Sequence, residues 1–405
     1  MPKTEMRLAI LGAGPIGLEA ALYARALQLP FTIYERGRVA EHVARWGHVR
    51  LFSPFGMNIT PLGRAAALKQ KPALEMPGND VCITGREHIQ TYLAPIAESL
   101  AGSIQTETQV LQIGRRGLHK DDDLGGAGRA KQPFRLLLRD RQNRERFDEA
   151  DVILDCTGTY GQHRWLGEGG LPALGEMAAE GQISYIVEDI LGERKNFYAN
   201  KNVLVVGGGF SAATTVSNLA QVAVDNNSTW VTWITRGTNS WPMKRIPNDP
   251  LKERDRLAVR ANNLAARGDA NVEYHGQTVI EAVESLGQDK GFRVVTRSAG
   301  AKKTIEADRI IGNVGYSPDR LLYRELQILE CHASFGPMPL ATALREEKEM
   351  GPETLRNPEP NYYILGAKSY GRNSAFLLKI GFEQVRDVFT LIMGNAGLDL
   401  YKGKK

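Results

Sequence analysis

Three kinds of segment alternate along the chain: short apolar runs, turns of small residues, and longer stretches with apolar positions at helical spacing. Residues 8–11 form the first apolar run, residues 18–27 favour a helix, and residues 31–34 form the next run. Short apolar runs beside turn signals are typical of buried strands, whereas apolar positions three and four residues apart are typical of helices. This order predicts a strand, a tight turn, a helix and a second strand.

The same order recurs in the second half of the chain. Residues 202–206 form an apolar run, a glycine-rich turn and a helical stretch follow, and residues 230–235 form another run. Further strand-like segments follow each unit, at residues 103–115 and 133–158 in the first and at residues 272–285, 291–298 and 305–319 in the second. A layout that is used twice is a signal at the level of the fold.

We therefore predict an α/β protein with two Rossmann-like three-layer dinucleotide-binding domains, each with an inserted antiparallel β-meander. Residues 1–160 begin the first domain, residues 161–315 form the second, and residues 316–405 complete the first. Helices are expected over residues 86–100, with Thr84 as N-cap, and over residues 374–394. The charged, glycine-rich residues 120–132 are expected to form an exposed hairpin tip that tolerates deletion.

The first turn carries glycine at three positions with a defined spacing: Gly12, Gly14 and Gly17. In a strand-turn-helix unit, the first glycine makes the turn, the second lets a pyrophosphate approach the backbone, and the third lets helix and strand pack closely. Glu35 follows the second strand and is placed to accept hydrogen bonds from an adenosine ribose. The complete unit predicts a dinucleotide site.

The second turn has Gly207, Gly209 and Ala212 on the same pattern, in which alanine is an accepted third residue. At the end of its second strand we place Arg236 where the first unit has Glu35, and a guanidinium suits the 2′-phosphate of NADP(H). The alternative is that Arg236 is a solvated loop cation. Lys244 and Arg245 are reserve candidates for the phosphate.

Composition narrows the class of protein. The 405 residues are 42% hydrophobic and 24% charged, and no apolar run approaches the roughly 18 residues that span a bilayer. We expect no membrane span and, since the N-terminus leads directly into the first strand, a cytoplasmic protein. The formal charge of +5 is spread along the chain, so we expect no nucleic-acid partner. A homo-oligomer stays open.

The spacing of the cysteines and histidines argues against a redox disulfide and against a metal site. Cys82, Cys156 and Cys331 form no CxxC, which disfavours a reductase with a local redox disulfide. Cys156 ends an apolar run and is interpreted as a small buried residue. The seven histidines show no metal spacing, so we expect no metal site.

A loop-rich segment after Glu35 is a candidate pocket wall because loops near cofactors often carry function. The alternative is that its aromatic residues serve packing and that Arg50 is a surface cation. No catalytic side chain is named; the pocket candidates are Arg50, Ser53 and Asn58, with Trp46, Phe52 and Phe55 beside them.

The motifs LGAGPIGLEAALYA, DVILDCTGTYG, VLVVGGGFSAATT and YYILGAKSYG resemble those of the two-dinucleotide-binding-domain flavoproteins, which include thioredoxin-reductase-like enzymes and flavin-containing monooxygenases. The resemblance covers nearly the whole chain. It implies FAD in the first unit and NAD(P)H in the second, and Arg236 favours NADPH as that coenzyme. The cofactor-binding residues that it implies are Gly12, Gly14, Gly17, Glu35, Arg36, Val110, Thr157, Gly158, Gly366, Ala367 and Lys368 for FAD, and Gly207, Gly209, Ser211, Ala212 and Arg236 for NADPH.

Within this family, the segment WGHVRLFSPF and the stretch before the second glycine turn look like the corresponding monooxygenase segments. They differ at Phe52 and at Glu188 and Asp189, where many members have Asn or Asp and a His-Ser pair. The resemblance implies an enzyme that oxidises a small amine or thioether through a flavin hydroperoxide. Two alternatives stay open: a reductase that passes electrons to a quinone or a partner protein, and a nucleotide-binding sensor without turnover.

Overall fold

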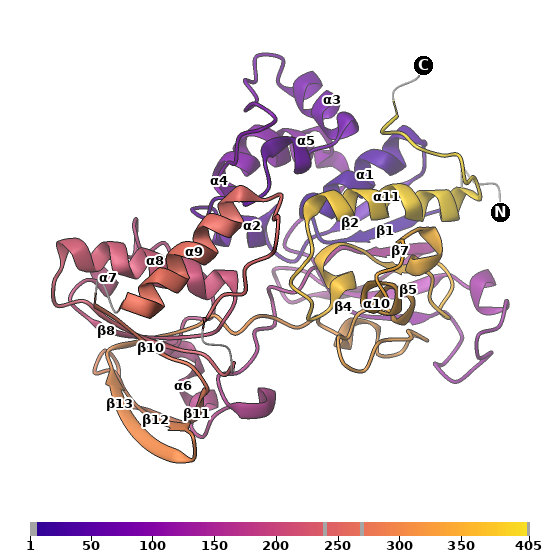
Figure 1. Cartoon of the computed structure of the whole chain (residues 1–405). Coiled ribbons are helices and arrows are strands. Elements are labelled where there is room, and N and C mark those ends of the chain that lie inside the picture. Colours follow the sequence, from indigo (N-terminus) through magenta and orange to yellow (C-terminus); the bar gives the residue numbers. More distant parts are fainter. Residues whose placement is uncertain (1–5, 238–240, 268–270, 403–405) are drawn as a thin grey trace. The chain divides into compact units, whose positions relative to one another are not determined.

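The computed structural model describes residues 6–237, 241–267 and 271–402. The chain divides into two compact units, which we call unit 1 (Met1–Gln162 with Ser317–Lys405) and unit 2 (His163–Tyr316) (Figure 1). The domain limits expected at residues 160 and 315 lie within two residues of these boundaries. Unit 2 is therefore inserted between two segments that together make unit 1.

Unit 1 is built on a five-stranded parallel sheet with the order β15-β7-β1-β2-β3. Its strands are β1 (Leu8–Leu11), β2 (Phe31–Tyr34), β3 (Ile104–Gln105), β7 (Val152–Asp155) and β15 (Tyr362–Ile364). The N-terminal segment supplies four of these strands, and the C-terminal segment supplies β15. The sheet is complete only when both segments have come together.

Side chains that alternate along β1 enter two different cores. Leu8 and Ile10 pack with α1 (Pro15–Ala26), α3 (Pro61–Gln70), α5 (Ala94–Ser99) and α11 (Leu378–Met393). Ala9 and Leu11 pack with the antiparallel sheet of β4 (Gln109–Arg115), β5 (Phe134–Arg139) and β6 (Glu145–Ala150). Because successive residues of a strand point to opposite faces, the parallel sheet is the middle of three layers.

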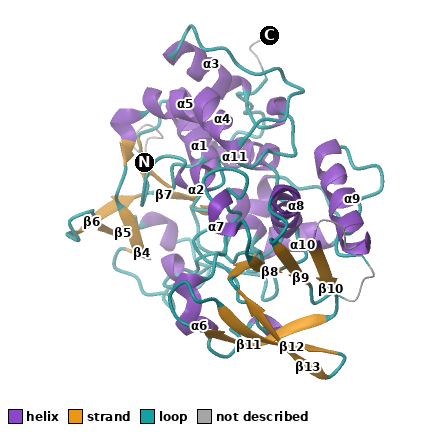
Figure 2. Ribbon diagram, turned by 90° about the vertical axis from the view of Figure 1, so that its left-hand side faces the viewer, coloured by secondary structure: helices purple, strands orange, loops and turns teal. Residues whose placement is uncertain are grey.

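Unit 2 repeats this arrangement. Its parallel sheet has the order β10-β9-β8-β14, formed by β8 (Asn202–Val206), β9 (Trp230–Ile234), β10 (Val272–His275) and β14 (Arg309–Gly312). Helices α8 (Phe210–Asp225) and α9 (Lys252–Arg267) cover one face. The antiparallel strands β11 (Thr278–Ser285), β12 (Phe292–Ser298) and β13 (Ala301–Ala307) cover the other (Figure 2). The predicted fold class is confirmed in both units.

Shorter elements of unit 1 are α2 (Glu41–Arg45), α4 (Gly85–His88) and α10 (Met338–Arg345), and those of unit 2 are α6 (Glu176–Ala179) and α7 (Lys195–Tyr198). The helix predicted over residues 86–100 is α4, a π-helical turn (Ile89–Leu93) and α5 in succession. Thr84 caps it as expected, since its hydroxyl accepts from the Glu87 N–H while Glu87 accepts from the Thr84 N–H. The last helix begins at Leu378, four residues later than predicted.

The strand predicted over residues 103–115 is two strands. Strand β3 pairs with β2 in the parallel sheet, whereas β4 pairs with β5 in the antiparallel sheet. Glu107, which lies between β3 and β4, has a φ of +50°. The segment 272–285 is divided in the same way into β10 and β11. An apolar-polar pattern does not reveal such a change of sheet, because both halves bury one face.

The prediction of an exposed hairpin tip at residues 120–132 is wrong for the C-terminal part of this segment, which is partly buried. Arg129 is fully buried, and its guanidinium binds the equally buried Glu359 carboxylate at 2.8 Å. Arg115 on β4 binds the other oxygen of that carboxylate at 2.7 Å. The stretch is therefore anchored to unit 1 by a buried ionic cluster.

Candidate functional site

The first glycine turn joins β1 to α1 at the carboxyl end of the parallel sheet. Gly12 has a φ of +94°, a conformation that L side chains rarely adopt, and a Cβ there would lie 2.9 Å from the Cys156 carbonyl oxygen. A Cβ on Gly17 would lie 1.9 Å from the Gly12 carbonyl oxygen. Both positions require glycine, the first for the turn and the second for the close approach of helix to turn.

Gly14 differs from its two neighbours, because a Cβ there would meet no atom within 4 Å. Gly14 is also the N-cap of α1, and no side chain caps this helix end. Unpaired N–H groups and the helix dipole make such an end favourable for an anion. The turn therefore leaves room and hydrogen-bond donors where a phosphate group would fit.

Glu35 follows β2 directly and turns its carboxylate back to this turn. One oxygen accepts the Ala13 N–H at 2.8 Å, and the other accepts the Gly37 N–H at 2.8 Å. A carboxylate oxygen has two acceptor sites, so each oxygen keeps one for a ligand hydroxyl. The expected neighbourhood of Glu35 and the glycine turn is present.

A second cluster lies at the carboxyl ends of β7 and β15. The Lys368 ammonium is 2.6 Å from an Asp155 carboxylate oxygen and 3.0 Å from the Thr157 hydroxyl. The Tyr362 hydroxyl donates to the same Asp155 oxygen at 2.9 Å, and the Thr157 hydroxyl donates to the other oxygen at 2.7 Å. The Lys368 and Asp155 side chains are 1% and 0% exposed, so this is a buried ion pair.

The structure thus brings the candidates Thr157 and Lys368 together around Asp155, which the sequence reasoning missed. The signal for Asp155 was its place as the only charged residue of the strand VILD. Gly366 has a φ of +70°, and its N–H donates to the Gln384 side-chain oxygen at 2.8 Å. A Cβ on Gly158 would meet no atom within 4 Å, so this turn is as open as that at Gly14.

The other candidates of unit 1 take varied positions. Ala367 is half-buried between Gly366 and Lys368, and Val110 is half-buried in β4 opposite Leu138. Arg36 is exposed, with a guanidinium nitrogen 3.4 Å from the His42 ring. Burial and the cations Arg36 and Arg45 lower the pKa of His42 to about 4, so this imidazole is neutral at neutral pH.

Two of the three pocket candidates bind each other. The buried Ser53 hydroxyl donates to the Asn58 side-chain oxygen at 2.8 Å, and the Asn58 amide donates to the Ser53 carbonyl at 3.0 Å. Arg50 is exposed and donates to the Cys82 carbonyl. These contacts stabilise the conformation of the loop over residues 50–58. A direct contact of Arg50, Ser53 and Asn58 with substrate stays a prediction.

The second glycine turn follows the design of the first. Gly207 has a φ of +140°, and a Cβ there would lie 2.2 Å from the Asn313 carbonyl oxygen. A Cβ on Gly209, the N-cap of α8, would meet nothing within 4 Å. Ala212 is fully buried against the turn, whereas Ser211 is exposed in the first turn of α8. Unit 2 therefore offers a second open helix N-terminus.

The register of the two sheets corrects the place of Arg236. The Gly12 N–H donates to the Tyr34 carbonyl, and the Gly207 N–H donates to the Ile234 carbonyl. The position after each of these strand residues is Glu35 in unit 1 and Thr235 in unit 2. Arg236 stands one position later, where unit 1 has Arg36. Its side chain is exposed and has no hydrogen bond or ion pair with the part of the chain that the structure describes.

The reserve candidates differ in availability. Arg245 forms a two-pronged ion pair with Asp255, with both nitrogen-oxygen distances at 2.8 Å. Lys244 is exposed, and among the described residues no acceptor binds it. Within the part of the chain that the structure describes, Arg236 and Lys244 are therefore unpaired, whereas Arg245 is engaged by Asp255.

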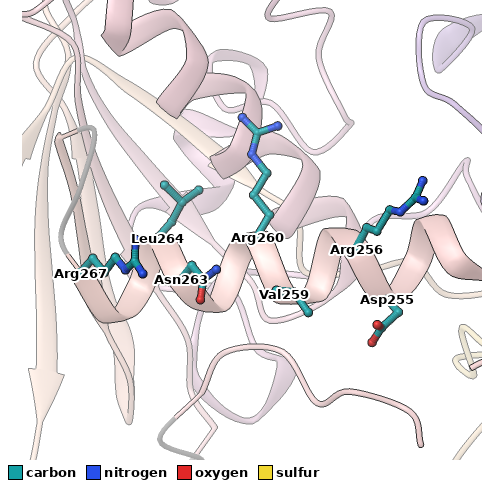
Figure 3. A pocket seen from close by; sticks show the side chains of 7 residues that line it. All are labelled: Asp255, Arg256, Val259, Arg260, Asn263, Leu264 and Arg267. Carbon is teal, nitrogen blue, oxygen red and sulfur yellow. The ribbon is translucent and has the colours of Figure 1, made fainter. Parts of the chain in front are cut away.

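A hollow of about 380 Å3 lies on α9 (Figure 3). Its seven lining side chains all belong to that helix: Asp255, Arg256, Val259, Arg260, Asn263, Leu264 and Arg267. Within residues 6–237, 241–267 and 271–402, no group of His, Cys, Asp and Glu side chains is arranged to hold a metal ion. No helix of that same part is long and apolar enough to cross a membrane.

We compared the sequence and the fold with those of known proteins. Residues 9–120 match the model of a family described as pyridine nucleotide-disulphide oxidoreductase. No curated protein sequence matches the chain. Among solved structures, bacillithiol disulfide reductase from Bacillus cereus is 15% identical with a TM-score of 0.71, covering 96% of this chain and 99% of its own.

Two further structures are similar over the same length. Thioredoxin reductase from T. acidophilum is 16% identical with a TM-score of 0.60, over 96% of this chain and 99% of its own. Ornithine N-hydroxylase from Kutzneria sp. 744, solved with reduced FAD, NADP+ and L-ornithine, is 14% identical with a TM-score of 0.62 over the same shares. This chain shares their fold. The predicted resemblance to the two-dinucleotide-binding-domain flavoproteins is confirmed at that level.

Proposed function

We propose that this chain is an FAD-dependent oxidoreductase that takes its electrons from NADPH. The observation that carries the proposal is the pair of glycine turns, each with an open position at a helix N-terminus, Gly14 in unit 1 and Gly209 in unit 2. The two units differ at the residue that follows the second strand. In unit 1 this residue is the acidic Glu35, and in unit 2 it is the neutral Thr235, with Arg236 beside it. One dinucleotide with a free ribose and one with a phosphorylated ribose fit this difference.

In this proposal the residues of unit 1 bind and orient FAD. The N–H groups at the start of α1 bind the pyrophosphate, and the free acceptor sites of Glu35 bind the adenosine ribose. FAD held by these residues would supply two-electron chemistry between the hydride of NADPH and an acceptor. In unit 2, the start of α8 binds the NADPH pyrophosphate, and Arg236 pairs with the 2′-phosphate.

We further propose that the acceptor is oxygen and that the substrate is a small amine or thioether. The fold is shared with ornithine hydroxylases and with a cadaverine monooxygenase from Erwinia amylovora, which has a TM-score of 0.63. Cys156 supports this choice over a disulfide reductase. Among the described residues none of the three cysteines forms a disulfide, and burial raises the pKa of the Cys156 thiol well above its usual value. A buried neutral thiol is a poor nucleophile.

The second candidate is a reductase that passes electrons to a quinone or a protein. It is favoured by the TM-scores of 0.71 and 0.67 with bacillithiol disulfide reductases, which exceed the 0.62 with the ornithine N-hydroxylase. The third is a sensor that binds both nucleotides without turnover.

One set of measurements separates the three. The purified protein is expected to be yellow and to release FAD in acid; release of FMN alone would contradict the site at Glu35. Anaerobic NADPH should bleach the flavin. Oxygen is then admitted with a panel of amines and thioethers, and oxygenated product is compared with NADPH consumed. Coupled product formation supports the monooxygenase, reoxidation by a quinone without product supports the reductase, and no bleaching overturns the enzyme proposal.

A further inference from the structure

We propose that Lys368 is an electrostatic positioning residue: its ammonium neutralises the buried Asp155 carboxylate beside the first glycine turn, so that an anionic pyrophosphate can bind there. The inference rests on the proposed binding of FAD to unit 1 and deepens it. It assigns a role in cofactor binding to the Lys368–Asp155 ion pair, which takes no part in the electron transfer itself.

The carboxylate is the centre of the cluster. Asp155 accepts from the Lys368 ammonium and the Tyr362 hydroxyl on one oxygen, and from the Thr157 hydroxyl and, at 3.2 Å, the Thr157 N–H on the other. Four hydrogen bonds therefore end on this one carboxylate. Lys368 supplies the only opposite charge among these partners.

The pair lies directly against the turn that we assign to the pyrophosphate. Cys156 and Thr157, the two residues after Asp155, touch Gly12. A Cβ on Gly12 would lie 2.9 Å from the Cys156 carbonyl oxygen and 3.3 Å from the Thr157 Cα. Asp155 ends β7, and the residues after β15 carry Lys368, so both side chains belong to the carboxyl edge of the sheet. Ligands of open parallel sheets bind outside that edge.

Stability alone does not account for this pair. Two charges lose their hydration when they are buried, and replacing a buried ion pair by apolar residues of similar size is often neutral or stabilising. The Lys368 ammonium also lies 5.0 Å from the centre of the Tyr323 ring, whose face attracts a cation. Asp155 without Lys368 would place a negative charge next to the two negative charges of a pyrophosphate.

Four proteins test the proposal: Lys368→Met, Asp155→Asn, the double variant, and the wild type. FAD is removed, and the dissociation constant of added FAD is measured for each apoprotein by flavin fluorescence. Lys368→Met should weaken FAD binding on the order of tenfold, because it leaves one uncompensated negative charge near the phosphates in a partly buried site. Asp155→Asn should leave it equal or tighter, and the double variant should return close to the wild type.

The opposite signs of the two single variants distinguish electrostatics from packing. If both single variants weaken FAD binding and the double variant does not recover, the pair serves structure and the proposal is overturned. Thermal unfolding of each apoprotein shows whether the single variants fold. If Lys368→Met does not fold, Asp155→Asn and the double variant still decide, because weaker FAD binding by both overturns the proposal.

Lys379→Met is the matched control, since Lys379 is an exposed lysine of α11 and should not change FAD affinity. The inference and the proposed function fail in different ways. A wild-type protein that binds no FAD contradicts the proposed function. A wild-type protein that binds FAD with the same affinity as all three variants contradicts only the role of Lys368.

Discussion

Glu19 is a buried carboxyl group in the middle of α1, one helical turn beyond the first glycine turn. Its side chain is almost fully enclosed, with one oxygen 2.9 Å from the Thr60 hydroxyl and the other 3.5 Å from the Tyr92 hydroxyl. Burial raises the pKa of Glu19 from 4.5 to about 7, against the effect of these hydrogen bonds. The group is thus largely protonated in the folded protein at mildly acidic pH.

This shift predicts a loss of stability as the pH rises. Between pH 4.5 and about 7 the unfolded chain releases the Glu19 proton while the folded chain keeps it, so the free energy of unfolding falls over this range and levels off above it. Since one pKa unit corresponds to roughly 1.4 kcal/mol, the loss amounts to roughly 3 kcal/mol. Urea unfolding of wild type and Glu19→Gln across this range measures it, because the variant lacks the titrating group.

The control is Glu75→Gln, which removes an exposed carboxyl group of the same unit. It should retain the slope of the wild type. An equal slope in the Glu19→Gln protein would show that another group causes the pH dependence.

We also expect a single residue to decide coenzyme choice. We expect Arg236→Ala to lower NADPH affinity by roughly one to two decades, because a charge-assisted pair with a phosphate contributes about 1.5 to 3 kcal/mol. NADH affinity should change little, since NADH has no 2′-phosphate. Rates of flavin reduction at varied NADPH and NADH measure both.

Arg267→Ala is the control for lost surface charge, because Arg267 is an exposed arginine of the same unit. A parallel loss of both coenzymes would make Arg236 structural. A preference for NADPH that survives the substitution would direct attention to Lys244. Equal use of both coenzymes by the wild type would remove the basis of the prediction.

The sequence was informative at these sites where the chemistry is local. Gly12, Gly14 and Gly17 fall within six residues, so their spacing alone predicts the turn. Thr235 was missed because the end of β9 is set by its pairing with β8, and a pattern of apolar residues leaves that end uncertain by a residue. Lys368 and Asp155 are 213 residues apart, and no periodicity links such residues.

At the scale of elements, the buried Glu359 carboxylate is one anchor of the segment 116–133, beside hydrogen bonds between the Gln327 side chain and Lys120, Asp122 and Gly125. Besides Glu359, the Arg129 guanidinium binds the carbonyl oxygens of His119 and Asp122, at 3.0 and 2.8 Å. The Gln327 N–H donates to Glu359 at 2.9 Å. The composition of this segment resembles that of a surface loop, and only the tertiary structure reveals its anchor.

We predict that Arg129→Met destabilises the protein by about 3 to 5 kcal/mol, because it leaves Glu359 buried with one cation fewer. Arg116→Met should cost at most about 1 kcal/mol, since that side chain is 63% exposed in its ion pair with Glu149. Chemical unfolding of both variants provides the comparison. Equal stabilities of the two variants would mean that the ionic cluster does not hold the segment.

At the scale of the molecule, the two units differ in how they can be separated. The strands of the parallel sheet of unit 2 and the cores on its two faces come from residues 163–316. The core of unit 1 that contains α1 also contains Tyr363, Phe382 and Val388 from the C-terminal segment. One unit is continuous in sequence, and the other is not.

A fragment of residues 163–316 should therefore fold by itself and unfold cooperatively in urea. A fragment of residues 1–162 should not, because it lacks β15 and α11. Circular dichroism and urea titration of the two purified fragments test this expectation. Cooperative unfolding of the N-terminal fragment, or none in the fragment 163–316, would contradict it.

The place of β15 also sets an order of events on the ribosome. Its partner β7 ends at Asp155, and β15 begins about two hundred residues later, at Tyr362. At 5 to 20 residues per second, synthesis of the intervening chain takes roughly 10 to 40 s. During this time the apolar β7 lacks the strand that later covers one of its sides, and exposed apolar strands invite aggregation. Unit 2 has emerged in full before that side is covered, so the nascent chain depends on protection of β7 until its last quarter is made.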